Sequence, residues 1–280
     1  MVGSGGADEI ESLCRAAHSG LVSKCLLVGE FAGLEELGMT PAEVEVIDVS
    51  AEESCWVGAR LTGEGEADVL VKGNVKSSEF LRAVLDRSSN LRTDTILSHI
   101  AVLDVPALDY LIGITDGGLN IAPDQEQKQA IIKNGILCMR ALGALRPHVA
   151  VLAASENVTS SMPATTHAAA LTAWAQRACP DAVVEGPLAF DLAVSQDALQ
   201  RKGVKSCLEG RADVWLMPNI ECGNMVAKCL ISFSNALMAG VVMGARVPLV
   251  LTSRADQPAS KLVSLAVATA VVRDGEPACE

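Results

Sequence analysis

The sequence predicts an α/β protein built on parallel or mixed sheets, with helices on both faces of the sheets. Short runs of Val, Leu and Ile alternate with amphipathic stretches, a pattern typical of βα units. Aromatic residues make up only 3% of the 280 residues, so the core must consist mainly of Ala, Val, Leu, Ile and Cys. Interiors of this composition favour helix-covered sheets over sandwiches. The length is compatible with two lobes or with one large domain.

The apolar runs predict the strands in chain order. Most runs span four to eight residues and are rich in Val, Leu and Ile, so we expect strands that are buried on both faces. The predicted strands are 24–29, 44–49, 67–73, 96–106, 110–118, 148–155, 183–190, 212–219, 239–244 and 247–253.

Helices are predicted in amphipathic stretches between these runs. Apolar residues recur there at helical spacing, which would place one apolar stripe against a sheet. The candidates are 79–86, 124–145, 164–177 and 259–272. The uncharged stretch 229–245 contains two serines, an asparagine and two glycines. It therefore indicates a buried helix, turn and strand, and not a membrane span.

Charge and cysteine content exclude several function classes. The formal net charge of −12 disfavours nucleic-acid binding and means that an anionic substrate needs local positive groups. The N-terminal residues lack the basic and apolar regions of a signal peptide, and the nine cysteines form no C-x-x-C pair. We therefore expect buried, reduced thiols in a cytoplasmic protein. The four histidines do not cluster with the cysteines, so no metal site is expected.

Polar residues follow several predicted strands, at the ends where α/β proteins bind ligands. The carboxyl ends of parallel strands share one edge of the sheet, and ligands bind beyond that edge. The polar segments are 72–74, 116–118, 155–157, 218–221 and 253–256.

Several of these segments, in the same order along the chain, resemble the phosphate acetyl/butyryl transferase family. The resemblance covers about residues 66–273 and is closer to the butyryl branch. It is carried by LVKGNVKSSEFLRAVLD (70–86), LSHIAVLDVP and ITDGGLNIAPD (within 97–124), VEGPLAFDLAVS (184–195), PNIECGNMVAK (218–228), AGVVMGARVP (239–248) and LTSRAD (251–256).

This resemblance implies a fold, a reaction and partners. The fold would have two lobes, as in isocitrate dehydrogenases, with the active site in the cleft between them. The outer lobe would combine 1–97 with 228–280, and 98–227 would form the inserted lobe. The reaction would move an acyl group reversibly between coenzyme A and inorganic phosphate, by direct thiolate attack in a ternary complex. Coenzyme A would be a co-substrate, no bound cofactor or metal would be needed, and the chain would form a homodimer or a higher homo-oligomer.

Three residues after the last strand are the catalytic candidates: Ser253, Arg254 and Asp256. The Arg254 guanidinium suits a phosphate or a developing oxyanion, and Ser253 offers a hydroxyl donor, although it could instead only cap the following helix. The family's acetyl branch has its proposed base further along, near Ser260, which cannot act as a base. Asp256 is the nearest carboxylate, so it is either the base that forms the thiolate or the ion-pair partner of Arg254.

The resemblance also supplies substrate-binding candidates. Gly73, Asn74, Ser77 and Ser78 would form a phosphate cradle at a helix N-terminus, or else an ordinary turn. The other candidates, each with a structural alternative, are Arg82 on that helix, Asp116 after a strand, and Asn224 and Lys228, which are four residues apart on one helix face.

Two other functions stay open at this point. A decarboxylating dehydrogenase of the same fold would need a cluster of Asp residues for Mg²⁺, which the chain lacks. A ligand-binding homologue that has lost catalysis would account for the absence of a carboxylate near Ser260.

Overall fold

The computed structural model describes residues 1–3, 7–31, 44–251 and 258–275, and these form two compact units. We call Met1–Thr95 with Ala239–Glu280 unit 1, and Ile96–Met238 unit 2. The sequence-based lobes, with boundaries at 97/98 and 227/228, stay a prediction. All ten predicted strands overlap a strand of the structure.

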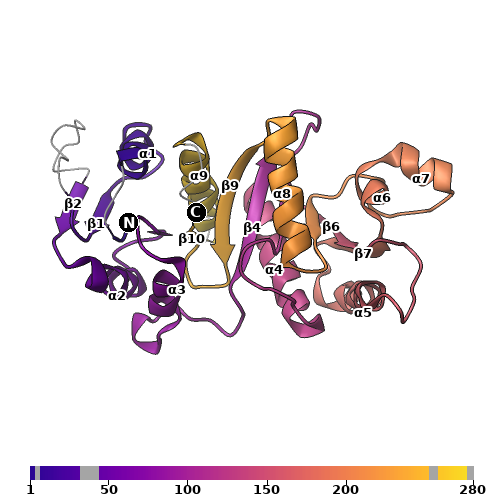
Figure 1. Cartoon of the computed structure of the whole chain (residues 1–280), viewed down its shortest axis with the longest axis horizontal. Coiled ribbons are helices and arrows are strands. Elements are labelled where there is room, and N and C mark those ends of the chain that lie inside the picture. The colour runs from indigo at the N-terminus through magenta and orange to yellow at the C-terminus, as the bar shows by residue number, and fades with distance from the viewer. Residues whose placement is uncertain (4–6, 32–43, 252–257, 276–280) are drawn as a thin grey trace, which may run out of the picture. The chain divides into compact units, whose positions relative to one another are not determined.

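Unit 1 contains short strands assembled partly through the N-terminal residues (Figure 1). Val2 forms parallel bridges with both Val28 and Lys72, and so connects the β1–β2 pair to β3. Strand β10 pairs with β3 in parallel and with β9 antiparallel. The strands are β1 (Cys25–Val28), β2 (Val44–Ile47), β3 (Leu70–Val71), β9 (Leu237–Met243, which begins in unit 2) and β10 (Leu249–Val250).

Four α-helices and one 3-10 helix complete the described part of unit 1. Helix α1 packs against α9, and α2 packs against α3. The helices are α1 (Ala7–His18), α2 (Ala51–Gly63), α3 (Ser77–Leu85), η2 (Arg87–Ser89) and α9 (Pro258–Gly275).

Five strands of the eight-stranded sheet lie in unit 2, in the order β4-β5-β8-β6-β7. Strands β5, β8, β6 and β7 are parallel to one another, and β4 pairs antiparallel with β5. The strands are β4 (Ser98–Asp104), β5 (Ile112–Thr115), β6 (His148–Leu152), β7 (Val183–Leu188) and β8 (Val214–Leu216).

Helices cover both faces of this sheet. On one face, Ile114 and Trp215 join a buried cluster with residues of α6, α7 and α8. On the other, Gly113 lies against Met139 of α4, and α5 packs on β6 and β7. Figure 1 shows α6 and α7 on the opposite side of β7 from α5. The helices are α4 (Gln125–Ala141), α5 (Pro163–Ala178), α6 (Phe190–Val194), α7 (Gln196–Lys202) and α8 (Ile220–Ser234).

The sheets are mixed and not wholly parallel. Only 105–111 separates β4 from β5, and only 244–248 separates β9 from β10. A parallel crossover needs about a dozen residues or more, so these short connections force antiparallel pairs.

Four helices were not predicted from the sequence, and one expected burial was wrong. Helices α1, α2, α6 and α7 were missed; α6 and α7 span only 5 and 7 residues, too few for a helical period to stand out. The stretch 229–245 does form a helix, turn and strand, but the outward side of α8 is exposed because only one side of that helix packs on the sheet. No helix among the described residues is long and apolar enough to cross a membrane.

Candidate functional site

The predicted site residues fall into both units. Gly73, Asn74, Ser77, Ser78 and Arg82 lie in unit 1, in the turn after β3 and on α3. Asp116, Asn224 and Lys228 lie in unit 2, after β5 and on α8. The three catalytic candidates, Ser253, Arg254 and Asp256, lie outside the described residues.

A buried lysine supports the turn after β3. Lys72 is only 6% exposed, and its ammonium donates to the carbonyl oxygens of Gly73 at 3.0 Å and Val75 at 3.1 Å. The Gly73 N–H donates to the carbonyl of Val2 at 2.9 Å. Because a buried ammonium must be hydrogen-bonded, these contacts fix the path of the chain into α3.

The N-terminus of α3 is open. Lys76 occupies the N-cap position with extended backbone but caps nothing with its side chain. Among the described residues no group accepts a hydrogen bond from the N–H groups of Ser77 or Ser78, and both residues are exposed. Arg82 is exposed one turn beyond Ser78, on the same side of the helix. Free N–H groups, the positive end of the helix dipole and a guanidinium together suit an anion such as phosphate.

In unit 2, Asp116 organises the loop after β5. Its side chain is buried and accepts four hydrogen bonds: from the N–H groups of Gly118 at 2.7 Å, Leu119 at 2.9 Å and His99 at 3.0 Å, and from Asn120 Nδ2 at 2.6 Å. Both carboxylate oxygens are therefore engaged by the chain itself. The loop is tied in this way to β4, the neighbouring strand.

This loop packs directly on the first turn of α8. A Cβ added at Gly223 would lie 2.6 Å from the carbonyl oxygen of Asp116, so only glycine allows this approach. Asn224 Nδ2 donates to the carbonyl of Gly117 at 3.1 Å. Lys228 follows one turn later and is exposed. The structure thus brings Asn224 to the Asp116 loop, although more than 100 residues separate the loop from the helix, and it shows no contact of Lys228 with that loop.

Sequence reasoning missed several residues that build these turns. Lys72 and Asn120 are not among the sequence-based candidates, although Lys72 begins one polar segment and Asn120 lies two residues beyond another. The imidazole of His99 packs against Gly118, where an added Cβ would lie 2.8 Å from the ring. The glycines of DGG and ECGN were the available signal, because adjacent glycines after a strand indicate close backbone contact.

A lysine–histidine contact lies between the first turns of α4 and α5, which both follow strands of the parallel set. Lys128 is 5% exposed, and its Nζ lies 3.4 Å from His167 Nδ1. Burial lowers the pKa of Lys128, and nearby Asp124 partly opposes this change. Burial and the Lys128 charge lower the pKa of His167. The charge of Lys128 therefore disfavours protonation of His167.

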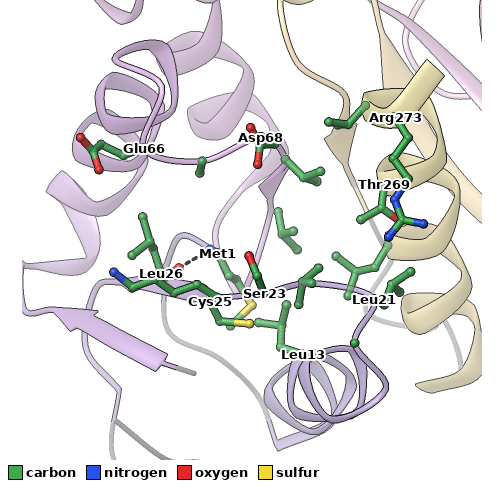
Figure 2. Close-up of a pocket in the computed structure, with 18 residues that line it drawn as sticks. Met1, Leu13, Leu21, Ser23, Cys25, Leu26, Glu66, Asp68, Thr269 and Arg273 are labelled. Atoms are coloured by element: carbon green, nitrogen blue, oxygen red, sulfur yellow. Dashed lines mark hydrogen bonds between the residues drawn. The ribbon is translucent and has the colours of Figure 1, made fainter. Parts of the chain in front are cut away.

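A cavity of about 380 Å³ lies elsewhere in unit 1. Leu13, Leu26 and Leu265 contribute to its apolar wall, and Asp68 and Arg273 are among its polar residues (Figure 2). None of the predicted site residues lines it. Among the described residues, no group of three or more His, Cys, Asp or Glu could hold a metal ion.

Comparisons with known proteins agree with the sequence resemblance. The sequence profile of a family described as "Phosphate acetyl/butaryl transferase" matches residues 29–270. A "Probable phosphate butyryltransferase" from Bacillus subtilis (strain 168) is 41% identical over 265 residues, covering 93% of this chain and 89% of the relative. A "Phosphate acetyltransferase" from Rhizobium meliloti is 42% identical over 226 residues, covering 80% of this chain and 72% of the relative.

Solved structures share the fold. A branched-chain phosphotransacylase from Enterococcus faecalis V583 matches with a TM-score of 0.85 and 30% identity, covering 97% of this chain and 99% of the other. A 4-hydroxythreonine-4-phosphate dehydrogenase from Klebsiella pneumoniae matches with a TM-score of 0.55 at 14% identity, covering 96% and 98%. The second match concerns the fold alone: this dehydrogenase has an α/β fold similar to that of the chain.

Proposed function

Because this chain belongs to the phosphate acetyl/butyryl transferase family, we propose that it transfers a short-chain acyl group reversibly between coenzyme A and inorganic phosphate. The chain is an acyltransferase by that membership. Its relatives carry both butyryltransferase and acetyltransferase names. The sequence has the forms S-R-A-D at 253–256 and K-G-x-V at 72–75, which lead us to propose the butyryl branch. A cytoplasmic location and a homo-oligomeric state stay predictions.

The proposed chemistry is direct transfer in a ternary complex. In one direction the coenzyme A thiolate attacks the acyl carbon of an acyl phosphate, a tetrahedral oxyanion forms, and the C–O bond breaks to release phosphate. In the other direction a phosphate oxygen attacks the thioester and the thiolate leaves. One group must accept the thiol proton in the first direction and return it to the leaving thiolate in the second. Both directions need donors for the oxyanion and a positive site for phosphate.

The open N-terminus of α3 is the structural observation that best supports this proposal. Its exposed N–H groups and the guanidinium of Arg82 offer the phosphate site that the reaction needs, and Lys72 holds the preceding turn in place. Gly73 and Asn74 belong to the same turn.

The remaining roles are proposed from the sequence. Arg254 and Ser253 would stabilise the oxyanion and the phosphate, and Asp256 would accept the thiol proton. Asn224 and Lys228 would contact substrate from α8. Asp116 would contribute by holding its loop, because its oxygens are already engaged.

Thiol release tests the function. The purified chain is mixed with acetyl-CoA, butyryl-CoA or valeryl-CoA, with and without inorganic phosphate, and free coenzyme A is followed with a thiol reagent. We expect phosphate-dependent release, fastest with butyryl-CoA. Release that does not depend on phosphate would indicate a thioesterase, and no release with any acyl group would favour a homologue that binds ligand without catalysis.

A further inference from the structure

Helix α9 lines the unit 1 cavity with residues that change from apolar to charged along the helix. Leu265 is only 3% exposed, Thr269 is partly buried and Arg273 is exposed. Residues four apart lie on one side of a helix, so these three form a row along one wall. Because the row runs from the interior to the surface, the cavity has an apolar inner end and a polar mouth.

The segment that enters β3 forms a second wall with the same division. Glu66 and Asp68 are exposed, whereas Val69 and Val71 are partly buried. The buried Leu13 of α1 adds further aliphatic surface. Among the described residues no aromatic side chain lines the cavity, so it offers no stacking surface to a nucleotide base.

The charges at the mouth do not neutralise one another. Asp68 and Arg273 come from different walls (Figure 2). Within the described part of the chain, neither of them forms an ion pair, and neither does Glu66. Lys24, the other basic side chain of the lining, is already paired with Glu45 at 2.5 Å. The mouth therefore offers carboxylates on one wall and a guanidinium on another.

A ligand that suits this arrangement needs three features. A carboxylate would match the planar fork of Arg273, and a positive group would match Asp68 or Glu66. An aliphatic part would cover the Leu and Val side chains of the inner end. A simple carboxylic acid would be repelled by the two acidic side chains, and a simple amine would leave Arg273 without a partner. An aliphatic α-amino acid has all three features.

We propose that this cavity binds an aliphatic α-amino acid such as leucine or valine. Its volume of about 380 Å³ lies within the range of about 300–1,000 Å³ that is usual for small-molecule sites. The ligand carboxylate contacts Arg273, its ammonium group lies beside Asp68 or Glu66, and its side chain packs against Leu13 and Leu265.

The cavity lies at the opposite end of β3 from the turn proposed to bind phosphate. Asp68 precedes β3, and Gly73 follows it. Val2 forms parallel bridges to β1 and β3 sides of unit 1, so these two strands run in the same direction and their entering ends share one edge. Amino acid binding at this edge is therefore separate from acyl transfer and does not depend on the proposed function.

Isothermal titration calorimetry of the purified chain, without coenzyme A or phosphate, tests this proposal. We expect binding of L-leucine and L-valine. Three comparison compounds each lack one feature: 4-methylpentanoate lacks the ammonium group, 3-methylbutylamine lacks the carboxylate and glycine lacks the aliphatic side chain. Each should bind at least about ten-fold more weakly than L-leucine, because each loses one class of contact.

Substitutions test whether binding takes place in this cavity. Arg273→Gln should weaken leucine binding about ten-fold or more, and so should the double variant Glu66→Gln, Asp68→Asn. Thr269→Phe should abolish binding although all three charges remain, because the larger side chain fills the cavity. The matched control is Arg177→Gln, since Arg177 is exposed in the last turn of α5 as Arg273 is in α9. Circular dichroism checks that each variant is folded.

Three results would each overturn the proposal. The first is no binding of L-leucine or L-valine by the natural chain up to about 10 mM. The second is equal binding of L-leucine and 4-methylpentanoate, which would show that the acidic side chains play no part. The third is an affinity for L-leucine that Arg273→Gln leaves unchanged.

Discussion

Two residues show how differently charged groups serve the candidate site. Arg82 is exposed beside the open start of α3, where it can meet an anion. Asp116 is buried and has both oxygens occupied by hydrogen bonds from the chain. The guanidinium of Arg82 is therefore available to an anion, whereas the carboxylate of Asp116 shapes its own loop. Their substitution should therefore affect different measurements.

Arg82→Gln should weaken the use of phosphate while leaving the fold intact. Loss of one exposed charge-assisted contact with a dianion costs about 1.5–3 kcal/mol, which corresponds to a KM for phosphate raised by about ten-fold or more. Initial rates at varied phosphate measure this change. Arg87→Gln is the control, because Arg87 is exposed in the next element, η2. Equal effects of the two substitutions would remove Arg82 from the proposed site.

Asp116→Asn should lower stability. The amide can accept with only one oxygen, and its NH₂ group would face N–H donors that now bind a carboxylate. Leaving such donors unsatisfied costs about 1–3 kcal/mol in the free energy of unfolding. Urea denaturation measures the loss. Asp109→Asn, which removes an exposed ion pair with Arg211, should change stability by less than about 1 kcal/mol. An unchanged urea midpoint for Asp116→Asn would contradict this role.

At the scale of elements, close contacts fix how the helices of unit 2 lie against one another and against the loops after its strands. Helix α8 reaches the loop after β5 only because Gly223 lacks a side chain. Helices α4 and α5 meet through Lys128 and His167 at their N-terminal ends. Both contacts oppose a local preference: glycine is a poor helix former, and two basic groups next to each other repel.

Gly223→Ala should destabilise the chain, although alanine is the better helix former. The intrinsic gain is about 1 kcal/mol, but the new methyl group would lie 2.6 Å from a backbone oxygen, and such overpacking costs about 1–3 kcal/mol. We expect a net loss on thermal unfolding. Ser232→Ala, at an exposed position of the same helix, should be neutral or slightly stabilising. A gain for Gly223→Ala would show that the loop moves away easily.

The α4–α5 contact should make stability depend on pH. The pKa of His167 is lowered in the folded chain, so between this lowered value and about 6.5 the unfolded chain binds more protons. The free energy of unfolding should therefore rise with pH across that window and fall on acidification. His167→Gln should reduce this slope in urea titrations at several pH values. His18→Gln, at an exposed position, is the control. An unchanged slope for His167→Gln would exclude the contact as its source.

At the scale of the whole molecule, the exposure of the cysteines shows which parts of the chain are buried. Five of the eight described cysteines are buried, as most of the nine were expected to be. Cys207, Cys222 and Cys229 are the accessible or partly accessible ones, and Cys279 lies outside the described residues. No disulfide therefore contributes to stability among the described residues.

Thiol labelling should follow this division. Cys207 should react quickly in the native chain, whereas Cys138 should react only after unfolding, because burial raises its pKa to about 12 and hides the sulfur. Mass spectrometry after timed labelling identifies each site. Reductant should leave the unfolding midpoint unchanged. Rapid labelling of Cys138 in the native chain would indicate that the α4 side of the unit 2 core opens readily.

The sequence by itself determined the family, the α/β class and the positions of all ten strands, because buried strands are recorded directly as short aliphatic runs. It also supplied the candidate site segments, because polar residues and glycines follow several of these strands. It did not predict helices α1, α2, α6 and α7. Of these, α6 and α7 are too short for a helical period to stand out.

Only the tertiary structure decided how these segments meet. It placed Gly223 against Asp116 and left the N-terminus of α3 open. It also showed that Lys72 supports the turn before α3 and that the outward side of α8 is exposed. The physical reason is that such contacts join residues far apart in the chain, whereas a sequence pattern reports only what neighbouring residues share. Which donors are satisfied and which face stays exposed depends on the packing of the whole unit.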